Sequence, residues 1–562
     1  MTLYVIKYIL NLTKYHLDNK MLKKSYIFII ILMYLTISCT KIEETITHTP
    51  PQGKYFSLVI NIGQEPYTMD PSINVTGDSL IYLNHIFEGL VGKDKDGKII
   101  PAAAKSWAIS ADGLVYTFNL RQDAYWSDGN PVLAKDFVYS FRRLFDPNTK
   151  SKFAYQYNVI NNSKNILEGE IETKYLGVEA IDDYTLEIVL DRPLTYFLEI
   201  LSYPTFYPLR EDIIKLYETN WTEKAETFIG NGPFKVVERK IDDVIIMEKN
   251  EFYWNNKEVI PSRLEFVMKN DTQYSLTALK NGLLHFSRNF PIEHIALLQR
   301  GGYIHNVPRI STYFYFLNTT NKTLSDINVR RALSLAIDRN YIVENVTKNG
   351  ERPATAFVPY GIPGFFGDFR ENGGDYIDID KKNYENNIRE AKRLMILAGY
   401  PNGNGFPVLT LKTTYGTHRK IFEAIQKMWK DNLGIDVNIE ELESSDLFTQ
   451  RFDKNFEMAS GGWNGDFNDP INFLSVFLST SPNNNSLYTN KRYDDLIKTA
   501  TLITDSSHRM MTMHKAEELL ISDMAMIPIY FSSEPILVSP KLKGVLYDSM
   551  GQHSFMRAYL ED

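Results

Sequence analysis

The stretch Trp126-Ser-Asp-Gly-Asn-Pro-Val132, followed by Lys135-Asp-Phe-Val-Tyr-Ser-Phe141, carries the most specific structural information in this sequence. Its Asp-Gly pair is a turn signal, and the proline that follows fixes the direction in which the chain leaves the turn. From residue 135 to residue 146 apolar side chains recur at helical spacing, which predicts an amphipathic helix packed on a larger body. The tryptophan stands where it can cover the start of that helix. The stretch therefore describes a scaffold and says nothing about a ligand.

Strands and helices are predicted on both sides of this stretch. The second half of the chain alternates strand and helix, as an α/β domain does. Residues 358–380 are rich in Gly and Pro and are predicted to form a long loop. The predicted strands are 56–62, 114–120, 184–190, 234–238, 244–248, 264–268, 312–318, 408–413, 435–440 and 456–460, and the predicted helices are 274–284, 293–299, 329–346, 387–398, 419–432 and 514–522.

The composition is that of a folded protein with several domains. Hydrophobic residues make up 44% and charged residues 23% of the 562 residues, which excludes a disordered, collagen-like or coiled-coil chain. The formal net charge of −8 argues against nucleic-acid binding, because that function needs clustered Lys and Arg to neutralise phosphates. The single Cys excludes intrachain disulfides, Cys-ligated zinc and iron–sulfur clusters.

That Cys lies in an N-terminal export pattern. Two lysines precede an apolar run over 26–37, which is too short for an ordinary membrane-spanning helix, and Ser38-Cys39 follows. The pattern resembles a bacterial lipoprotein signal, in which the Cys is acylated and becomes the first residue of the mature protein. Thr36 stands where the lipoprotein motif usually has Leu. We therefore expect lipidation at Cys39.

Lipidation at Cys39 makes residues 1–38 a signal peptide, with its true start at Met21, and residues 39–54 an extended tether. Removing residues 1–38 takes away five Lys and one Asp and changes the net charge from −8 to −12. No second long apolar run follows, so we expect an exported protein held by lipid at the cell membrane, facing the periplasm or the cell exterior. The alternative is an uncleaved N-terminal anchor with an incidental Cys.

The sequence offers no catalytic constellation. It has no G-x-x-x-x-G-K-[ST] phosphate loop, no H-E-x-x-H zinc helix and no G-x-S-x-G nucleophile elbow. The ten His are scattered without metal-ligand spacing, and paired carboxylates such as Asp182-Asp183 and Asp494-Asp495 suit turns and helix caps. We expect a protein that is not an enzyme and that needs no cofactor and no metal.

Short motifs follow one another in a definite order along the chain. They are Glu65-Pro66, Asp70-Pro71, Ile86-Phe-Glu-Gly-Leu-Val91, Pro101-Ala-Ala-Ala-Lys-Ser-Trp107, the stretch from Trp126 to Phe141, Asn231-Gly-Pro-Phe234, Asn250 to Trp254, Val329-Arg-Arg-Ala-Leu333, Gly462-Trp-Asn-Gly-Asp-Phe-Asn-Asp-Pro470 and Ile527-Pro-Ile-Tyr530. This ordered set resembles the oligopeptide-binding lipoproteins of bacterial ABC peptide importers, within the peptide/nickel-type extracellular solute-binding proteins. The resemblance covers nearly all of residues 55–562.

The resemblance implies an α/β fold of the periplasmic-binding-protein type, with two lobes around a cleft and an extra domain inserted in the first lobe. Lobe I is expected to be discontinuous, the inserted domain to span residues 89–210, and lobe II to span residues 311–532. The chain is expected to cross between the lobes near Arg309-Ile310 and Ser532-Ser533, where a hinge allows closure around a ligand. The segments of lobe I are 55–88, 211–310 and 533–562.

The resemblance also implies a role for Asp466. In the family, an Asp three residues after the Trp of the Gly-Trp motif pairs with the free α-amino group of the peptide, and here that position is Asp466. A buried ammonium group needs such a carboxylate. The alternative is an ordinary turn residue, but Asp469-Pro470 already supplies an N-cap and a first-turn proline for the helix that follows. We therefore expect Asp466 to bind the amine.

Other matched positions concern the peptide's carboxylate end and side chains. Arg451 occupies the place of a family arginine that meets the carboxylate of some peptides, and the alternative for it is a solvated helix residue. A second family arginine is Ser460 here, and a pocket tryptophan of some members is Ser444. The cross-linked cysteines of the family correspond to Ser311 and Asn464, so that disulfide is absent.

A peptide bound as an extra strand is recognised mainly through backbone groups, which any sequence can supply. The resemblance places one ligand-pairing strand at Val75 and Gly77 and the other at Gly462, Trp463 and Asn464. It adds an aromatic position and a polar pair. These last positions are Phe153, Arg288 and Asn289.

These features predict a monomeric, lipid-anchored receptor that captures short peptides and delivers them to an ABC permease in the inner membrane, without binding nucleic acid. One alternative keeps the fold and changes the ligand to a nickel chelate, haem or a sugar. Another is a surface lipoprotein paralogue that acts as an adhesin, which Ser444 and Ser460 leave open. A lipoprotein hydrolase is disfavoured by the missing motifs.

Overall fold

The computed structural model describes residues 56–66, 68–73, 79–95, 97–151, 154–503 and 505–561. The predictions made for Cys39, Val75, Gly77 and Phe153 lie outside these residues. Within them, no helix combines the length and the apolar character that crossing a bilayer requires.

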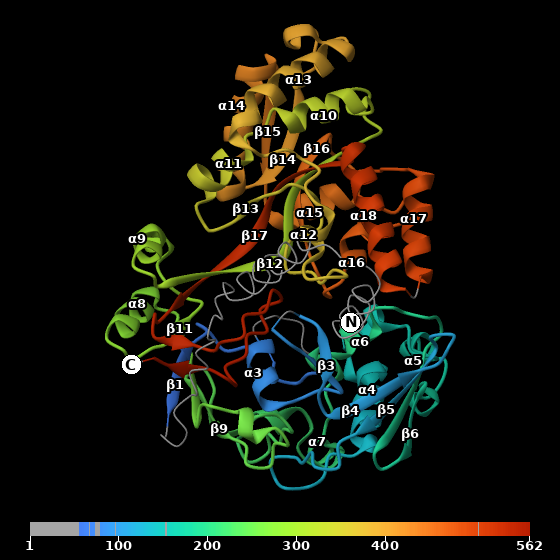
Figure 1. Cartoon of the computed structure of the whole chain (residues 1–562), viewed down its shortest axis with the longest axis vertical. Helices are drawn as coiled ribbons and strands as arrows, with labels where there is room; N and C mark the ends of the chain where they lie inside the picture. Colours follow the sequence, from blue (N-terminus) through green and yellow to red (C-terminus); the bar gives the residue numbers. More distant parts are fainter. Residues whose placement is uncertain are drawn as a thin grey trace, which may run out of the picture. The chain divides into compact units, whose positions relative to one another are not determined.

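One large mixed sheet organises the described chain (Figure 1). Its two long strands, β12 and β17, are antiparallel and lie side by side, and each takes part in both halves of the sheet. A short strand, β13 (Arg352–Pro353), pairs with β17 off the main path. The strand order is β15 (Val437–Leu442), β14 (Leu409–Thr414), β16 (Met458–Asn464), β12 (Ile304–Leu317), β17 (Met526–Val538), β11 (Phe286–Ser287), β1 (Ser57–Asn61), β10 (Arg263–Val267), β9 (Val244–Lys249) and β8 (Phe234–Lys240).

The ladder between β12 and β17 is interrupted at one place. The paired residues are Pro308 with Ser533 and then Thr312 with Phe531, so three residues of β12 stand opposite Ser532 alone. Such a bulge bends and twists a strand pair. The interruption lies at the two crossings that the sequence predicts as a hinge.

The part of the chain that forms the strands from β11 to β8 also forms short helices. A hairpin joins β8 to β9, as predicted, through Asp242 with its positive φ of 60°. Gly232 lies so close to α3 that a Cβ there would be 2.6 Å from the backbone of Ile86 and Phe87, so only glycine fits. The helices are α3 (Leu80–Ile86), α7 (Glu211–Tyr217), α8 (Thr272–Lys280) and α9 (Ile295–Arg300), and a small hairpin pairs β18 (Leu542–Lys543) with β19 (Tyr559–Leu560).

Residues 89–210 form a four-stranded antiparallel sheet beside three helices. The helix predicted at 135–146 is α4 (Ala134–Phe145), and Trp126 covers its start as predicted, because its Nε1 donates to Asp136 at 3.1 Å. Gly129 adopts a φ of +85°, which the Asp-Gly turn requires. The order is β4 (Ala104–Ile109), β5 (Val115–Leu120), β7 (Thr185–Val189) and β6 (Val178–Asp182), with α5 (Ser163–Leu167), α6 (Phe197–Leu201) and the pair β2 (Val91–Lys93) and β3 (Ile99–Pro101).

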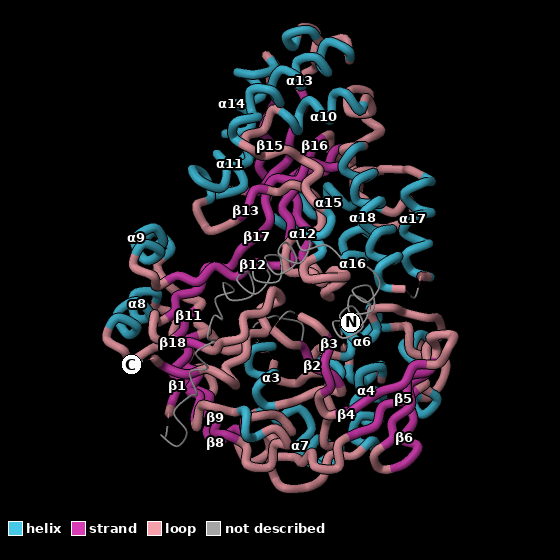
Figure 2. The backbone as a smooth tube through the Cα atoms, viewed as in Figure 1, coloured by secondary structure: helices cyan, strands magenta, loops and turns pink. Residues whose placement is uncertain are grey.

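The other half of the large sheet carries most of the long helices, as the tube view shows (Figure 2). The helices α10, α13 and α14 pack in sequence on one another, and α17 packs on α18. The helices are α10 (Ile327–Leu335), α11 (Arg339–Tyr341), α12 (Phe369–Gly373), α13 (Tyr384–Leu397), α14 (Thr417–Leu433), α15 (Ser444–Phe452), α16 (Pro470–Leu474), α17 (Lys491–Leu502) and α18 (Ser506–Ser522).

Two large hydrophobic cores lie under these layers. The first takes its residues from Leu58 to Val307 and from Ile536 to Ala558, and it includes the four-stranded sheet of 89–210. The second takes its residues from Ile310 to Tyr530. The change from one core to the other falls at the interrupted part of the β12–β17 ladder.

The prediction of one helix over 329–346 was wrong. α10 ends at Leu335, and a new start at α11 continues as a π-helix over Ile342–Thr347. The guanidinium of Arg339 is buried, and its Nε donates to the carbonyl of Pro528 at 2.7 Å. Asp338 accepts from the backbone N–H of Tyr341 at 2.9 Å and starts the second helix. Arg339 also donates to the carbonyl of Ser334 at 3.0 Å, so its side chain joins the end of α10 to a distant strand.

Other boundaries also differ. The strand predicted at 312–318 is the second half of β12, which begins eight residues earlier, and the strand predicted at 456–460 continues to Asn464 because β12 pairs with all of it. The predicted loop 358–380 contains α12. The long strand β17 was missed, because its buried, partly continuous apolar pattern lacks a strand's alternation.

Candidate functional site

The C-terminal half of β16 has a free edge. β14 pairs with β16 only at Met458 and Ala459, and from Ser460 onward no described strand lies on that side. On the other side, the N–H of Gly465 donates to the carbonyl of Ile310 at 2.7 Å. In an antiparallel pair the direction of the backbone groups alternates along the strand. The N–H and C=O groups of residues 464, 462 and 460 therefore point away from β12, toward the free edge.

This geometry distinguishes the predicted pairing residues from one another. Gly462 and Asn464 are exposed, and their backbone groups are directed to the free edge, so both can pair with an added strand. Trp463 is half-buried and contributes through its side chain. Gly461 cannot accept a side chain, because a Cβ there would collide with Arg451 and Phe316.

Asp466 lies just beyond the end of this edge. Its side chain is exposed, yet the surrounding protein raises the pKa of its carboxyl by desolvation, which outweighs the hydrogen bond from the side chain of Asn472. No Lys or Arg among the described residues forms an ion pair with it. Asp469 is the N-cap of α16, as predicted, and accepts from the N–H of Ile471 at 2.9 Å. Asp466 is therefore not needed as the cap of this helix.

Asn472 was missed by the sequence reasoning. Its Oδ1 accepts from Nε1 of Trp463 at 2.7 Å, and its side chain also bonds Asp466. The tryptophan is a donor only, so it orients the amide and leaves the NH2 group for the carboxylate. The signal available in the sequence was the position of Asn472 just after Asp469-Pro470, at the start of a helix. Its burial and its partners become apparent only in three dimensions.

Arg451 lies at the opposite end of the free edge. It sits in the last turn of α15, and its Nη1 donates to the carbonyl of Ser460 at 3.1 Å. Its guanidinium also lies 5.5 Å from the ring centroid of Phe316, and desolvation lowers its pKa. Arg451 is half-buried and has no ion pair among the described residues, whereas Ser444, at the start of the same helix, is exposed.

Ser311 and Asn464 are directly opposite each other in the β12–β16 ladder. Because the neighbouring pair, Ile310 with Gly465, is the hydrogen-bonded one, residues 311 and 464 form a non-hydrogen-bonded pair, in which side chains approach most closely. The positions of the family cysteines are therefore adjacent in space, although neither residue here is a cysteine.

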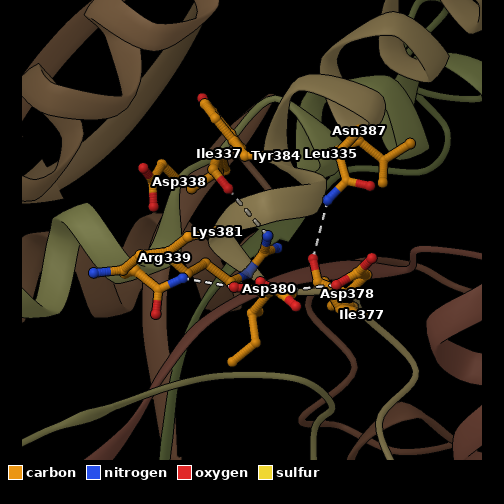
Figure 3. A pocket seen from close by; sticks show the side chains of 12 residues that line it. Leu335, Ile337, Asp338, Arg339, Ile377, Asp378, Asp380, Lys381, Tyr384 and Asn387 are labelled. Carbon is orange, nitrogen blue, oxygen red and sulfur yellow. Dashed lines mark hydrogen bonds between the residues drawn. The ribbon is translucent and has the colours of Figure 1, made fainter.

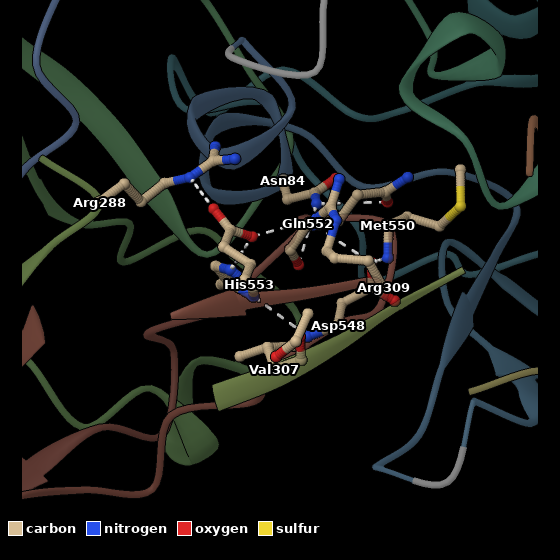
Figure 4. A network of polar contacts seen from close by, with 10 residues as sticks. Asn84, Arg288, Val307, Arg309, Asp548, Met550, Gln552 and His553 are labelled. Atoms are coloured by element: carbon tan, nitrogen blue, oxygen red, sulfur yellow. Dashed lines mark hydrogen bonds and ion pairs between the residues drawn. The ribbon is translucent and has the colours of Figure 1, made fainter. Parts of the chain in front are cut away.

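Arg288 belongs to a second polar group together with Arg309 and His553 (Figure 4), and all three lie near Glu534 of β17. Nε of Arg288 donates to Glu534 at 2.5 Å, and Arg309 approaches the other oxygen at 3.2 Å. Nε2 of His553 lies 3.8 Å from Glu534, beyond hydrogen-bond distance. Burial alone would raise the pKa of Glu534, but these three neighbours outweigh it and lower the pKa to about 2.

Arg288 and Asn289, the predicted polar pair, therefore make part of their hydrogen bonds inside the protein. Nη1 of Arg288 is buried and has no hydrogen-bond partner among the described residues, so the side chain keeps one free donor group. Asn289 donates to the carbonyls of Lys269 at 3.1 Å and Asn270 at 2.8 Å, which fixes a turn.

Two hollows are present elsewhere. One, beside α11 and the segment 377–381, has a volume of about 10 Å³, the size needed by a single water, so it is not a ligand site (Figure 3). The other, of about 170 Å³, lies at the interrupted ladder. No cluster of three or more His, Cys, Asp or Glu in the described parts of the chain is arranged to hold a metal ion.

Comparison with known proteins gives concordant results. Residues 98–485 match the family described as bacterial extracellular solute-binding proteins, family 5 Middle. The dipeptide-binding protein DppE of Bacillus subtilis (strain 168) is 35% identical over 498 residues, which cover 88% of this chain and 90% of that protein. These matches extend over both halves of the large sheet.

Solved structures also match nearly the whole described chain. The unliganded open form of MppA, a periplasmic murein tripeptide binding protein, has a TM-score of 0.83 at 31% identity, covering 90% of this chain and 98% of that one. Haemophilus influenzae OppA in complex with the peptide RPPGFSPFR has a TM-score of 0.64 at 31% identity, covering 90% and 99%. At equal coverage, the arrangement of this chain is nearer to the open form, and the predicted two-lobed α/β fold is confirmed. The chain belongs to the bacterial extracellular solute-binding proteins of family 5, which include the oligopeptide- and dipeptide-binding proteins of ABC importers.

Proposed function

We propose that this protein captures short peptides, which lie as an added strand along the free edge of β16. The observation that carries the proposal is that Gly462 and Asn464 direct unpaired backbone groups to an edge that ends at Asp466. Backbone pairing gives affinity without demanding a particular sequence. Asp466 supplies the negative charge that a peptide's free amino group needs.

The two ends of the edge set the direction of the peptide. Asp466 follows the C-terminal end of β16, and Arg451 bonds Ser460 near the other end of the edge. A peptide with its amino group at Asp466 therefore runs antiparallel to β16, with its carboxylate toward Arg451. Arg288 offers one further free donor group to the ligand.

The same proposal includes the lobe boundaries and the hinge. Lobe I consists of 55–88, 211–310 and 533–562, with the domain 89–210 inserted, and lobe II is 311–532. The separate cores and the interrupted ladder between Pro308 and Thr312 support this division. The closer likeness to an unliganded open form supports closure upon binding.

We further propose that the protein is a monomer, anchored by acylated Cys39, which passes its peptides to an ABC permease and catalyses no reaction. The lipoprotein pattern and the family of importer-binding proteins support this. The importer explains why capture is useful: an exported receptor at the membrane raises the local concentration of peptide at the permease.

The test is mass spectrometry of small molecules released from denatured, freshly purified protein. Short peptides with free amino ends are the expected result. A haem, a sugar or a metal chelate in their place would contradict the peptide proposal while leaving the fold intact. A site that is empty, and that also fails to bind a mixed peptide pool in solution, would favour the adhesin alternative.

A further inference from the structure

A cavity of about 170 Å³ lies beside the interrupted ladder between β12 and β17. In the sheet, β16 is on one side of this strand pair and β13 is on the other. The cavity takes its lining from both strands of the pair and from the segment around β13, and none of it from β16. Its lining consists of Asn306, Pro308, Arg309, Gly350, Arg352, Tyr360, Phe531, Ser532 and Ser533.

The lining has two guanidinium groups and no carboxylate. Arg309 shares its one carboxylate, Glu534, with Arg288. Arg352 lies 4.8 Å from the ring centroid of Tyr360 and has no ion pair among the described residues. The carboxylate of Glu351, next in sequence, is turned to Thr347 and to the N–H of Asn349.

Neutral polar groups complete the lining. Asn306 brings an amide, and Ser532 and Ser533 bring hydroxyl groups from β17, which donate within the protein to Oγ of Ser311 at 3.0 Å and to the carbonyl of Val307 at 3.4 Å. Gly350, with a φ of +82°, lies so close to Asn306 that a Cβ there would be 2.7 Å from its amide carbon and oxygen. The backbone can approach here only because residue 350 is a glycine. Two arginines and an amide in the lining of one hollow form a set of donors suited to an oxyanion.

We propose that this cavity is a binding site for a small anion with a carboxylate or phosphate group. One ordered water needs only about 10–15 Å³ of such space, so a volume of about 170 Å³ is room for an inorganic oxyanion or a short dicarboxylate. Arg352 binds the anion from the β13 side, and Arg309 binds it from the strand pair.

The position of the cavity couples the anion to opening of the protein. Arg309, Ser532 and Ser533 lie where the ladder is interrupted, whereas Arg352 pairs with Phe531 in lobe II. An anion that bridges the two arginines stabilises the arrangement in which the cavity exists, and this arrangement is nearer to the open form of MppA than to a peptide complex. The anion should therefore weaken peptide binding, and peptide should weaken anion binding by the same factor. This coupling rests on the proposed function, but the anion site does not.

The site is tested on the peptide-free mature protein with phosphate, sulfate and succinate, each compared with chloride at equal ionic strength and pH. We expect the oxyanions to raise the melting temperature of the wild type beyond the effect of chloride. The phosphate and succinate arms distinguish an inorganic oxyanion from a carboxylate. Arg352→Gln and Asn306→Asp should each weaken anion binding about tenfold or more, since each removes or opposes a charge-assisted contact.

Arg492→Gln is the matched control, because Arg492 is an exposed arginine at the start of α17, and it should behave as the wild type. Equal stabilisation of all four proteins, or none beyond chloride in the wild type, would overturn the site. The coupling is tested by titrating trialanine with and without phosphate. A weaker affinity in the wild type only, and not in Arg352→Gln, supports it; an unchanged affinity overturns the coupling and leaves the site standing. If the protein binds no peptide, the proposed function fails, while the melting temperatures still decide the anion site.

Discussion

Tyr196 and Phe467 stack face to face, with ring centroids 4.4 Å apart and planes 4° from parallel. Tyr196 precedes α6 in the segment 89–210, and Phe467 follows Asp466 in the turn after β16. The charge of Asp469 and burial raise the pKa of Tyr196 to about 12, burial being the larger cause. The turn that carries Asp466 is therefore held by an aromatic contact with the domain proposed as the insertion, in addition to its own strand.

Removing either ring of this stack should destabilise the protein. An aromatic pair contributes about 0.5–1.5 kcal/mol beyond the area it buries. We expect Tyr196→Leu and Phe467→Leu to show a coupling of that size in a double-mutant cycle, measured by urea denaturation of the peptide-free protein. Two effects that simply add would show that the rings do not support each other.

The charge of Asp466 should govern the preference for a free amino end. Asp466→Asn keeps the shape of the side chain and removes the charge, and losing one partner of a buried charge pair typically costs about 2–5 kcal/mol of binding. That corresponds to roughly 30-fold to a few thousand-fold weaker affinity. The measurement is a titration of wild type and variant, each with one peptide bearing a free or an acetylated N-terminus. The two losses should not add, because both changes break the same pair.

The same carboxylate predicts the pH dependence of binding. The pKa of Asp466 is raised, so its proton is taken up at a pH above the ordinary range of an aspartate. Affinity for a free-amine peptide should be constant at neutral pH and fall as the pH drops through that raised value, because the neutral acid cannot pair with the ammonium. The acetylated peptide is the control and should lose much less. An equal decline for both peptides would contradict the assignment.

Glu534 should stabilise the fold at neutral pH and not in strong acid. Its pKa is about 2 in the folded protein against 4.5 for a free glutamate, so its contribution is complete above pH 4.5 and is lost as the pH falls toward 2. The difference corresponds to about 3 kcal/mol. Glu534→Gln should therefore lower the free energy of unfolding by about that amount at pH 7 and by much less near pH 2–3. Glu293→Gln, at an exposed position, should change little at either pH.

A disulfide should form between positions 311 and 464 when both are made cysteine. The two residues are a directly opposed, non-hydrogen-bonded pair. In a Cys39→Ser background, Ser311→Cys with Asn464→Cys should lose both free thiols on oxidation and gain about 2–4 kcal/mol of stability, reversed by reductant. Thr312→Cys with Asn464→Cys is out of register by one residue and should stay reduced. A bond in the control alone would mean that the register is wrong.

Processing of the N-terminus is predicted to depend on Cys39. The mature native protein should begin at an acylated Cys39, with two or three chains, because one chain holds a protein at a membrane only marginally. Intact-mass analysis of Cys39→Ser should find an unprocessed or released protein, and Thr40→Ser should be processed normally. An unmodified Cys39 in native protein would refute the lipoprotein prediction.

Local sequence signals were sufficient for much of the fold and for part of the site. The Asp-Gly turn before α4, the cap at Asp469 and the amphipathic helices depend on neighbours within a few residues, so their patterns can be read directly. The Gly-Trp motif also led to the proposed roles of Asp466, Gly462 and Asn464, through resemblance to a family. That the backbone groups of these last two face an open edge follows only from the pairing with β12.

The sequence by itself determined the family and the two-lobed α/β fold, because these are encoded in ordered local motifs. Only the tertiary structure decided that Arg288 is held by Glu534, 246 residues away, that Arg339 joins the end of α10 to Pro528, and that Tyr196 supports the turn beside Asp466. The reason is physical: each of these contacts joins residues far apart in the chain, and which of them meet is set by strand register and by the packing of layers. A buried polar group takes whichever partner the fold brings within hydrogen-bond distance, and no local pattern specifies that partner.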